Sequence, residues 1–356
     1  MHDMDHSRYI LGFAQAKDHD HPRMGGKCAS LARMIAAGVA VPPGYAVLTE
    51  AYAEFLAKSG LSQAISDILT DISVEDVVDE ETKSAKIRDL ILRAPMPAAI
   101  ARAIRAGYAA LSPAGDLPVA VRSSATAEDM PDASFAGQQD TYLWVVGADE
   151  VVAKVKACWA SLFNARAISY REKNHSGQLG VLMSVGVQKM VNAAAAGVAM
   201  TLDPINGDRT KIVIDSAFGL GEPVVSGEIT PDHFVVEKVL LQVINRQIAE
   251  KDFELVADAA AKTTVSRAIE GERRRRASLT DAQVIAVARL AKLLEKQSGC
   301  PQDVEWAFDR DLPAGENLLA LQSRPETVWS QKAQAAPKKT YALGIEGVLG
   351  TLMSPL

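Results

Sequence analysis

Two short strand-like segments near the C-terminal end carry side chains that suit a magnesium triphosphate. The segments DVEWAFD (303–309) and LLALQSRPE (318–326) alternate polar and apolar residues and have a Gly-containing connection, so they can pair as a hairpin. A two-residue period puts four polar residues on one face: Asp303, Glu305, Gln322 and Arg324. Carboxylate and amide oxygens are hard ligands for a metal, and a guanidinium is a forked donor for phosphate. The alternative is an exposed hairpin face with an ordinary Glu–Arg pair.

A second candidate is the stretch RMGGKCASLARM (23–34), which places two glycines and Lys27 just before a helix. Glycines let backbone N–H groups approach an anion closely, a helix start adds partial positive charge, and a lysine adds a full charge. This combination suits a nucleotide phosphate. A turn with a solvated lysine remains the alternative from these residues alone.

In the stretch VAVRSSATAED (119–129), an apolar run is followed by Arg122 and then by two serines. Small and hydroxyl residues can end a strand and turn or cap the next segment. That structural interpretation leaves the arginine unexplained.

These candidates must be positioned by a mixture of helices and strands. Residues 51–112 and 149–170 have helical patterns, and a T-x-x-Q capping box at 280–283 opens the most regular helix. Strands are predicted at 181–191, 197–202, 211–215 and 233–245. The arginine run at 273–276 is interpreted as a solvated loop, with an anion or partner contact as the alternative.

Composition limits the possible partners. The chain has 356 residues and a net charge of −6, so nothing in its overall charge favours nucleic acid or an anionic membrane. No stretch approaches a membrane span, and the N-terminus has no signal-peptide pattern, so we expect a cytoplasmic protein. Cys28, Cys158 and Cys300 are scattered, which indicates buried thiols rather than disulfides or a thiolate metal site.

Five motifs, in order along residues 20–326, resemble the nucleotide-binding half of phosphoenolpyruvate synthase, pyruvate phosphate dikinase and the rifampicin phosphotransferases. They are GGKCASLARM, VAVRSSATAEDMPDASFAGQQDTYLWV, SAFGLGEPVVSGEITPDHFVV, DVEWAFD and LQSRPETV. The resemblance implies an α+β ATP-grasp fold, in which two α+β lobes close on the nucleotide. It implies ATP and Mg²⁺ as cofactors.

The resemblance also assigns roles to individual residues. By this likeness the phosphates are bound by Lys27, Arg122 and Arg324, which are also the implied catalytic residues. Gly137 and Thr141 match positions that cover or contact the phosphates, and Gln188 matches one near the adenine. The implied magnesium ligands are Glu305 and Gln322, with Asp303 behind them. Small residues after Arg122 are expected to keep its turn compact.

The resemblance implies three parts of the chain: an N-terminal ATP-grasp lobe with a helical insert (1–190), a C-terminal lobe with the magnesium hairpin (191–330), and a linker or docking tail (331–356). Other polar residues have less definite roles. Glu222 and Asp232 are interpreted as structural, and His19 and His21 as loop residues rather than metal ligands.

No histidine lies in the G-G-x-x-S-H-A-like motif that accepts phosphate in complete family members. The arrangement is similar to phenylphosphate synthase, in which a separate subunit carries the histidine and the acceptor site. This likeness predicts that the β-phosphoryl group of ATP passes to a partner's histidine and then to phenol, releasing AMP and phosphate. The alternatives are a nucleotide-binding fragment of a one-chain phosphoenolpyruvate synthase or rifampicin phosphotransferase-like enzyme, a non-catalytic ATP-binding regulator, and an ADP-releasing ATP-grasp ligase.

Overall fold

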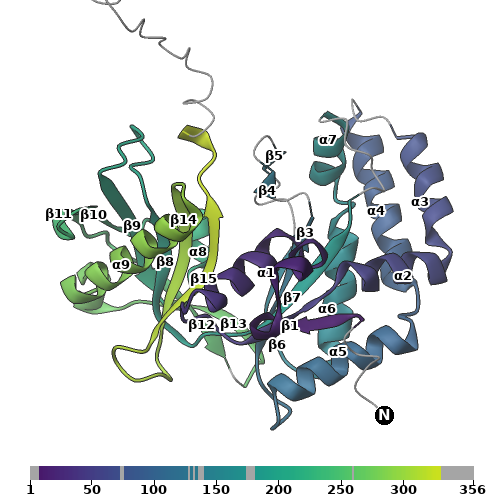
Figure 1. The fold of residues 1–356 in the computed structure, drawn as a ribbon, viewed down its shortest axis with the longest axis horizontal. Coiled ribbons are helices and arrows are strands. Elements are labelled where there is room, and N and C mark those ends of the chain that lie inside the picture. The colour runs from purple at the N-terminus through teal and green to yellow at the C-terminus, as the bar shows by residue number, and fades with distance from the viewer. Residues whose placement is uncertain are drawn as a thin grey trace, which may run out of the picture.

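The computed structural model describes residues 8–72, 76–126, 129–130, 133–134, 140–173, 181–258 and 260–329. Within them, two large antiparallel sheets lie side by side with helices packed against each (Figure 1). The α+β class expected from the sequence is confirmed.

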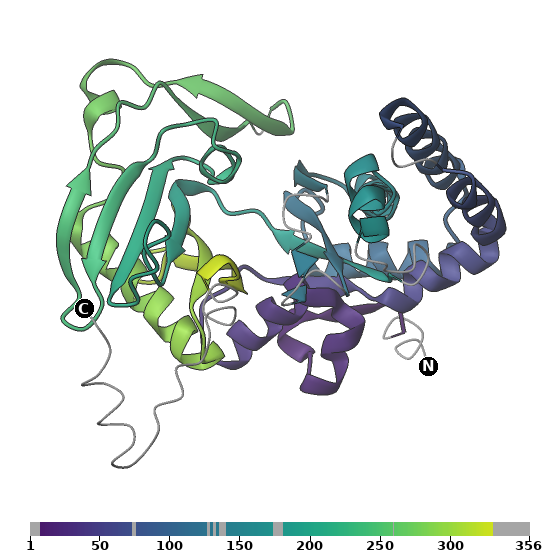
Figure 2. The same cartoon turned by 90° about the horizontal axis from the view of Figure 1, so that it is seen from above.

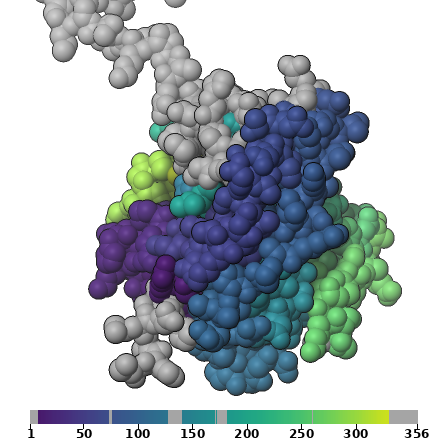
Figure 3. Space-filling model, turned by 90° about the vertical axis from the view of Figure 1, so that its right-hand side faces the viewer, coloured from purple at the N-terminus to yellow at the C-terminus, as the bar shows by residue number. Residues whose placement is uncertain are grey.

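The first sheet has five strands in the order β1-β2-β7-β3-β6. Its strands are β1 (Ile10–Gly12), β2 (Gly44–Val47), β3 (Val119–Ala125), β6 (Thr141–Val145) and β7 (Met183–Lys189). The helices of this half of the chain are α2 (Thr49–Ser59), α3 (Leu61–Thr70), α4 (Val77–Arg93), α5 (Ala98–Leu111), α6 (Ala148–Ser161) and α7 (Ala165–Lys173). One face of the sheet packs against α2, α5 and α6, around a core that includes Trp159 and Phe55. Figure 3 shows the outer surface that α2 to α5 form on this side.

The second sheet has six strands in the order β11-β10-β9-β8-β14-β15. Its strands are β8 (Ala193–Met200), β9 (Lys211–Phe218), β10 (Asp232–Glu237), β11 (Gln242–Gln247), β14 (Gln302–Asp309) and β15 (Leu318–Pro325). Helix α9 (Asp281–Ser298) packs on one face, and the short helix α8 (Glu222–Ser226) contacts β8 and β9. The Thr280 hydroxyl accepts from the Gln283 backbone N–H, and the Gln283 side chain accepts from the Thr280 backbone N–H. The predicted capping box of α9 is therefore confirmed.

Helix α1 (His21–Ala36) lies between the two sheets (Figure 1). It contacts β3 and β7 of the first sheet and β15 of the second. The Ser30 hydroxyl donates to the Ser323 carbonyl at 2.6 Å, which ties the helix directly to β15. A separate hairpin, β12 (Phe253–Asp258) with β13 (Thr263–Ala268), extends from the second sheet, and β13 contacts β6 (Figure 2).

Two sequence predictions about element bounds were wrong. The helix predicted over 149–170 is two helices, because the chain turns after α6 and the Asn164 side chain accepts from the Ala167 N–H at 2.8 Å to start α7. The strand predicted over 233–245 is two strands, β10 and β11, paired antiparallel around a turn. Whether the two sheets are separate domains that meet at 190–191 stays a prediction.

Candidate functional site

Lys27 is positioned by a kink in α1. Gly25 has a φ of 67°, and a Cβ there would lie 2.0 Å from the Ser124 carbonyl oxygen, so only glycine fits this close approach of helix and strand. The Ser124 hydroxyl donates to the Met24 carbonyl at 2.9 Å and accepts from the Cys28 N–H at 3.1 Å. Lys27 follows the kink, and its Nζ donates to the Ser123 carbonyl at 3.2 Å.

These contacts correct the expectation of a compact turn after Arg122. The strand β3 continues through Ser123 and Ser124 to Ala125, paired with β7 along its whole length. The Ser124 hydroxyl holds the second part of α1, whereas Lys27 is held by the main-chain carbonyl of Ser123, which any residue at that position would supply. The arginine and the serines that come after it therefore have separate roles.

Arg122 extends from β3 toward the second sheet. Its Nη1 lies 3.5 Å from the Leu321 carbonyl oxygen, and its Nη2 lies 3.9 Å from Oε2 of Glu305. Both contacts are long for charge-assisted hydrogen bonds, which are typically about 2.7–2.9 Å. Its Nε is buried and has no hydrogen-bond partner among the described residues. The guanidinium therefore retains hydrogen-bonding capacity in the cleft between the sheets.

The hairpin β14–β15 is formed as predicted. Glu305 lies opposite Gln322, and Asp303 lies opposite Arg324, so the four polar residues share one face of the sheet. On the opposite face, Val304 and Trp306 are fully buried against α9 and its neighbours. The register shifts after Glu305, which lets both Leu321 and Gln322 line the cleft.

Asp303 and Arg324 form the outer pair of this face. Arg324 Nε lies 3.5 Å from Asp303 Oδ2, and the arginine side chain is 43% exposed. Burial raises the pKa of the Asp303 carboxyl, Arg324 opposes that rise, and the nearby Glu326 and Glu305 add to it. Burial is thus the main reason for the raised pKa, and the carboxyl groups of Asp303 and Glu305 lie on this face with Arg324 beside them.

One pocket collects four of the residues singled out from the sequence: Lys27, Arg122, Gln188 and Gln322. Gln188 is buried and donates from Nε2 to the Pro42 carbonyl at 3.1 Å. Through its contact with Arg122, Glu305 lies beside the same pocket. Cationic groups from α1 and from the first sheet thus meet oxygen donors from the second sheet.

The remaining expected site residues lie apart from this pocket. Thr141 is opposite Arg122 in the β3–β6 register but is exposed and does not line the pocket, and neither does Arg324. Gly137 lies outside the described residues. The binding roles of all eight residues stay predictions.

Five lining residues were not expected from the sequence: Phe13, Cys28, Leu31, Gly186 and Leu321. Cys28 was correctly interpreted as buried, but its position against the pocket was missed. A Cβ at Gly186 would lie 3.0 Å from the Cys28 sulfur, so glycine there allows α1 to pack close to β7. Of these five, only Gly186 could have been predicted from the sequence, because a glycine inside an apolar strand pattern often marks a close approach of another segment.

The donor set fits a magnesium ion in part. Glu305 and Gln322 are paired across the hairpin and supply a carboxylate and an amide oxygen. Within the described residues there is no group of three or more His, Cys, Asp or Glu side chains that could hold a metal. Magnesium commonly takes one or two carboxylates and completes its shell with water and substrate phosphate, so two protein ligands are compatible with it.

Other sequence interpretations are settled by contacts. Asp232 is fully buried and accepts from Lys251 Nζ at 2.5 Å and from the Ser278 N–H and hydroxyl at 2.7 Å, so its structural role is confirmed. The interpretation of the arginine run as solvated holds for the exposed Arg275 and Arg276 but was wrong for Arg273, which makes two 2.7 Å hydrogen bonds to the buried Glu254. None of the helices among the described ranges has the length and apolarity to cross a membrane.

Comparison with known proteins identifies this arrangement. Residues 21–344 match the family described as the pyruvate phosphate dikinase AMP/ATP-binding domain. Similar curated proteins include a probable phosphoenolpyruvate synthase of Staphylothermus marinus, 43% identical over 95% of this chain and 44% of its own length. The phosphoenolpyruvate synthase of Pseudomonas aeruginosa is 41% identical over 96% of this chain and 44% of its own length.

The chain therefore spans less than half the length of these relatives. The match covers α1, the β14–β15 hairpin and the strands of both sheets other than β1. On these grounds the chain belongs to the family of pyruvate phosphate dikinase AMP/ATP-binding domains.

Proposed function

We propose that this chain is the ATP-binding portion of a phosphoenolpyruvate synthase-like phosphotransferase. It binds Mg-ATP between the two sheets, and the β-phosphoryl group passes to a histidine in another part of the enzyme, with release of AMP and phosphate. The observation that carries the proposal is the pocket where Lys27 and Arg122 meet Gln322, with Glu305 3.9 Å from the Arg122 guanidinium.

The proposed roles of Arg122 and Lys27 follow from the negative charge of the phosphates. Phosphoryl transfer spreads negative charge over the phosphate oxygens, and a protein accelerates it mainly by positioning and by stabilising that charge. Arg122 offers a forked donor whose protein contacts are long, so it can shorten its hydrogen bonds to a phosphate without breaking strong ones. Lys27 adds a point charge from the start of the kinked helix segment.

Glu305 and Gln322 are the residues that would hold the metal, because they are paired oxygen donors next to the Arg122 guanidinium. When bound there, Mg²⁺ would supply positive charge that offsets the charge of the phosphates. The carboxyl groups of Asp303 and Glu305 on the same face of the hairpin support a cation there.

The acceptor is better assigned to pyruvate than to phenol. The two relatives are named phosphoenolpyruvate synthases, whereas nothing among them supports the phenylphosphate synthase role predicted from the missing histidine motif. The histidine-bearing part can be a further domain or a separate subunit, since the relatives are more than twice as long. A cytoplasmic location remains part of this proposal.

The product of ATP cleavage tests the proposal. With the complete enzyme and pyruvate, ATP labelled in the β position should label a histidine outside this chain and yield AMP. Formation of ADP would favour a carboxylate–amine ligase, and Mg-ATP binding without cleavage would favour a regulator. Labelling that is discharged by phenol but not by pyruvate would restore the phenylphosphate synthase assignment.

Glu305→Gln tests the metal site. It should lower AMP formation far more than binding of metal-free ATP, because it removes the only carboxylate proposed as a ligand. Asp215→Asn is a matched control: it removes a carboxylate from the same sheet but one that is hydrogen bonded to His233 at 2.7 Å. Identical magnesium dependence in Glu305→Gln and the parent would exclude Glu305 as a ligand.

A further inference from the structure

The strand that carries Gln322 and Arg324 lies at the edge of the six-stranded sheet. Among the described residues, β15 pairs with β14 on one side and has no strand on the other. The register shift after Glu305 also leaves Leu321 without an opposite residue on β14. A bulge of this kind disrupts the ladder of hydrogen bonds locally. Pairing with β14 alone therefore gives this part of β15 weak support.

Two hydrogen bonds from the N-terminal half of the chain hold this edge. The Ala320 N–H donates to the Ala40 carbonyl at 2.9 Å, and the Ser30 hydroxyl donates to the Ser323 carbonyl at 2.6 Å. These bonds lie on either side of residues 321–322, which line the candidate pocket. The part of β15 that its own sheet supports least is thus held by α1 and by the segment that follows α1.

Ser30 belongs to the same helix segment as the candidate phosphate-binding lysine. It follows Lys27 by three residues, less than one turn, and both residues come after the kink at Gly25. Ser30 is 7% exposed and is not among the described residues that line the pocket. Because the helix is regular between the two residues, the bond from Ser30 to β15 also sets how far Lys27 lies from Gln322.

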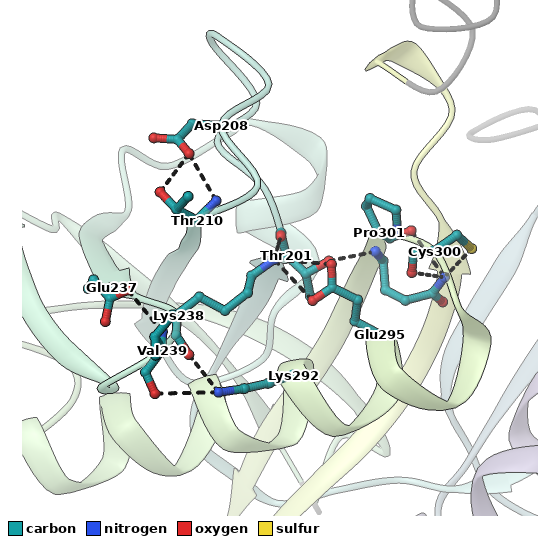
Figure 4. A network of polar contacts seen from close by, with 11 residues as sticks. Thr201, Asp208, Thr210, Glu237, Lys238, Val239, Lys292, Glu295, Cys300 and Pro301 are labelled. Atoms are coloured by element: carbon teal, nitrogen blue, oxygen red, sulfur yellow. Dashed lines mark hydrogen bonds and ion pairs between the residues drawn. The ribbon is translucent and has the colours of Figure 1, made fainter. Parts of the chain in front are cut away.

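The Ser323 side of this bond is anchored in a buried polar network. The Ser323 hydroxyl donates to Gln302 Oε1 at 2.9 Å. The Gln302 N–H donates to the Thr201 hydroxyl at 2.8 Å, and the Thr201 N–H donates back to the Gln302 carbonyl at 2.9 Å. Figure 4 shows the Thr201 end, where Lys238 donates to the Thr201 carbonyl and pairs with Glu295 of α9 at 3.0 Å. The end of the hairpin is thereby fixed to the second sheet and to α9.

This network contributes geometry more than stability. The side-chain polar atoms of Ser30, Ser323, Gln302 and Thr201 all have hydrogen-bond partners. A hydrogen bond adds modest net stability, but it is directional, and a fully satisfied network favours one arrangement of its members. Apolar side chains could fill the same space without fixing the distance between α1 and β15 so narrowly.

We propose that Ser30 is a positioning residue for phosphoryl transfer: through Ser323, its hydroxyl sets the spacing between Lys27 and the β14–β15 hairpin. This inference rests on the proposed function. Stabilising the transferring phosphoryl group requires the lysine and the oxygen donors of the hairpin to act together, and a misplacement of about 1 Å can cost a large part of the rate. Binding of the nucleotide in its ground state tolerates a small change in their spacing.

Two matched serine variants test the proposal. Ser84 of α4 is 1% exposed and donates to the Phe163 carbonyl at 2.6 Å, and neither residue lines the pocket. Ser30→Ala and Ser84→Ala each remove a buried hydroxyl bonded to the carbonyl of a distant segment, so their unfolding temperatures should fall by similar amounts. In the complete enzyme with pyruvate, Ser30→Ala should lower kcat for AMP formation about tenfold and change KM for Mg-ATP less than about threefold. Ser84→Ala should leave both constants unchanged.

Two further variants separate positioning from stability. Ser30→Cys keeps nearly the same side-chain size and replaces the hydroxyl with a weak donor, so the protein should fold and show the same fall in kcat. In a Lys27→Met background, Ser30→Ala should lower the remaining rate less than about twofold, because the side chain that it positions is gone.

The outcomes distinguish this inference from the proposed function. Equal kcat values in Ser30→Cys, Ser84→Ala and the parent would overturn the inference and leave the function standing. A tenfold fall that persists in the Lys27→Met background would do the same. Failure of the parent enzyme to form AMP from ATP would overturn both.

Discussion

Two clusters of charged side chains in this protein have similar composition but differ in how well their hydrogen bonds are satisfied. Between the sheets, the nearest contacts of Arg122 are 3.5 Å and 3.9 Å long, and its Nε has no partner among the described residues. At the base of the β12–β13 hairpin, Glu254 is buried and receives bonds of 2.7–2.8 Å from Arg273 and Arg267. Arg273 also lies over the Phe218 ring at 4.3 Å.

The difference separates binding from stability. A buried carboxylate must have its hydrogen bonds satisfied, and Glu254 is satisfied by the protein itself. The guanidinium of Arg122 is only partly satisfied, which costs stability unless a ligand completes its contacts. Sequence interpretation treated the four-arginine run as a solvated loop, and only the contacts reveal that Arg273 belongs to the stabilising cluster.

The largest expected effect is on stability, at the fully buried ion pair between Asp232 and Lys251. Asp232→Asn should destabilise the protein by about 3–5 kcal/mol, because it leaves the buried ammonium of Lys251 without its counter-charge. Chemical denaturation at pH 7 measures the change. Asp215→Asn, on a partly exposed pair with His233, is the control and should cost much less. Equal losses in both variants would remove the distinction between the two pairs.

The next effect concerns the binding cluster. Arg122→Met keeps an apolar stem and removes the fork, so AMP formation by the complete enzyme should fall about 10²–10³-fold, or about 3–4 kcal/mol, while the unfolding temperature stays nearly constant. Rapid-quench measurement of AMP and calorimetric unfolding provide the two readings. Loss of stability without loss of rate would assign Arg122 to the structural class instead.

The pH dependence of stability should report the Glu254 cluster. Hydrogen bonds from Arg273 lower the pKa of Glu254 to about 2, against an unfolded value of 4.5. Its contribution is therefore present above pH 4.5 and is lost as the pH falls through 2, which amounts to about 3 kcal/mol. Denaturant titrations between pH 5 and 2 should show a slope that Glu254→Gln reduces. The same slope in parent and variant would mean that Glu254 does not carry this dependence.

The smallest effect separates members of the arginine run. Arg275 is 71% exposed and lies 3.3 Å from Glu250, so Arg275→Ala should change stability by less than about 1 kcal/mol. Arg273→Ala should cost clearly more, because it removes two bonds from buried Glu254. Parallel thermal melts of the two variants compare them, and equal changes would return the whole run to the solvated class.

The sequence by itself determined the features that depend on local spacing. The two-residue period of 303–309 and 318–326 fixed the hairpin and its polar face, and Thr280 with Gln283 fixed the start of α9. The family was also evident from short motifs, since glycines, charges and their spacing lie within single segments. These patterns can be recognised within one segment, without knowing how that segment packs against the rest of the chain.

Only the tertiary structure decided which groups meet across the chain. The bond from Lys27 to Ser123 spans 96 residues, and that from Arg122 to Leu321 spans 199. Contacts between distant segments also explain why Phe13 and Cys28 line the pocket and why the Ser124 hydroxyl bonds to α1. The same holds for the bonds between Arg273 and the buried Glu254. Periodicity specifies the face on which a side chain lies but not the segment that packs against it, because that choice is made by the combined burial of two sheets around α1.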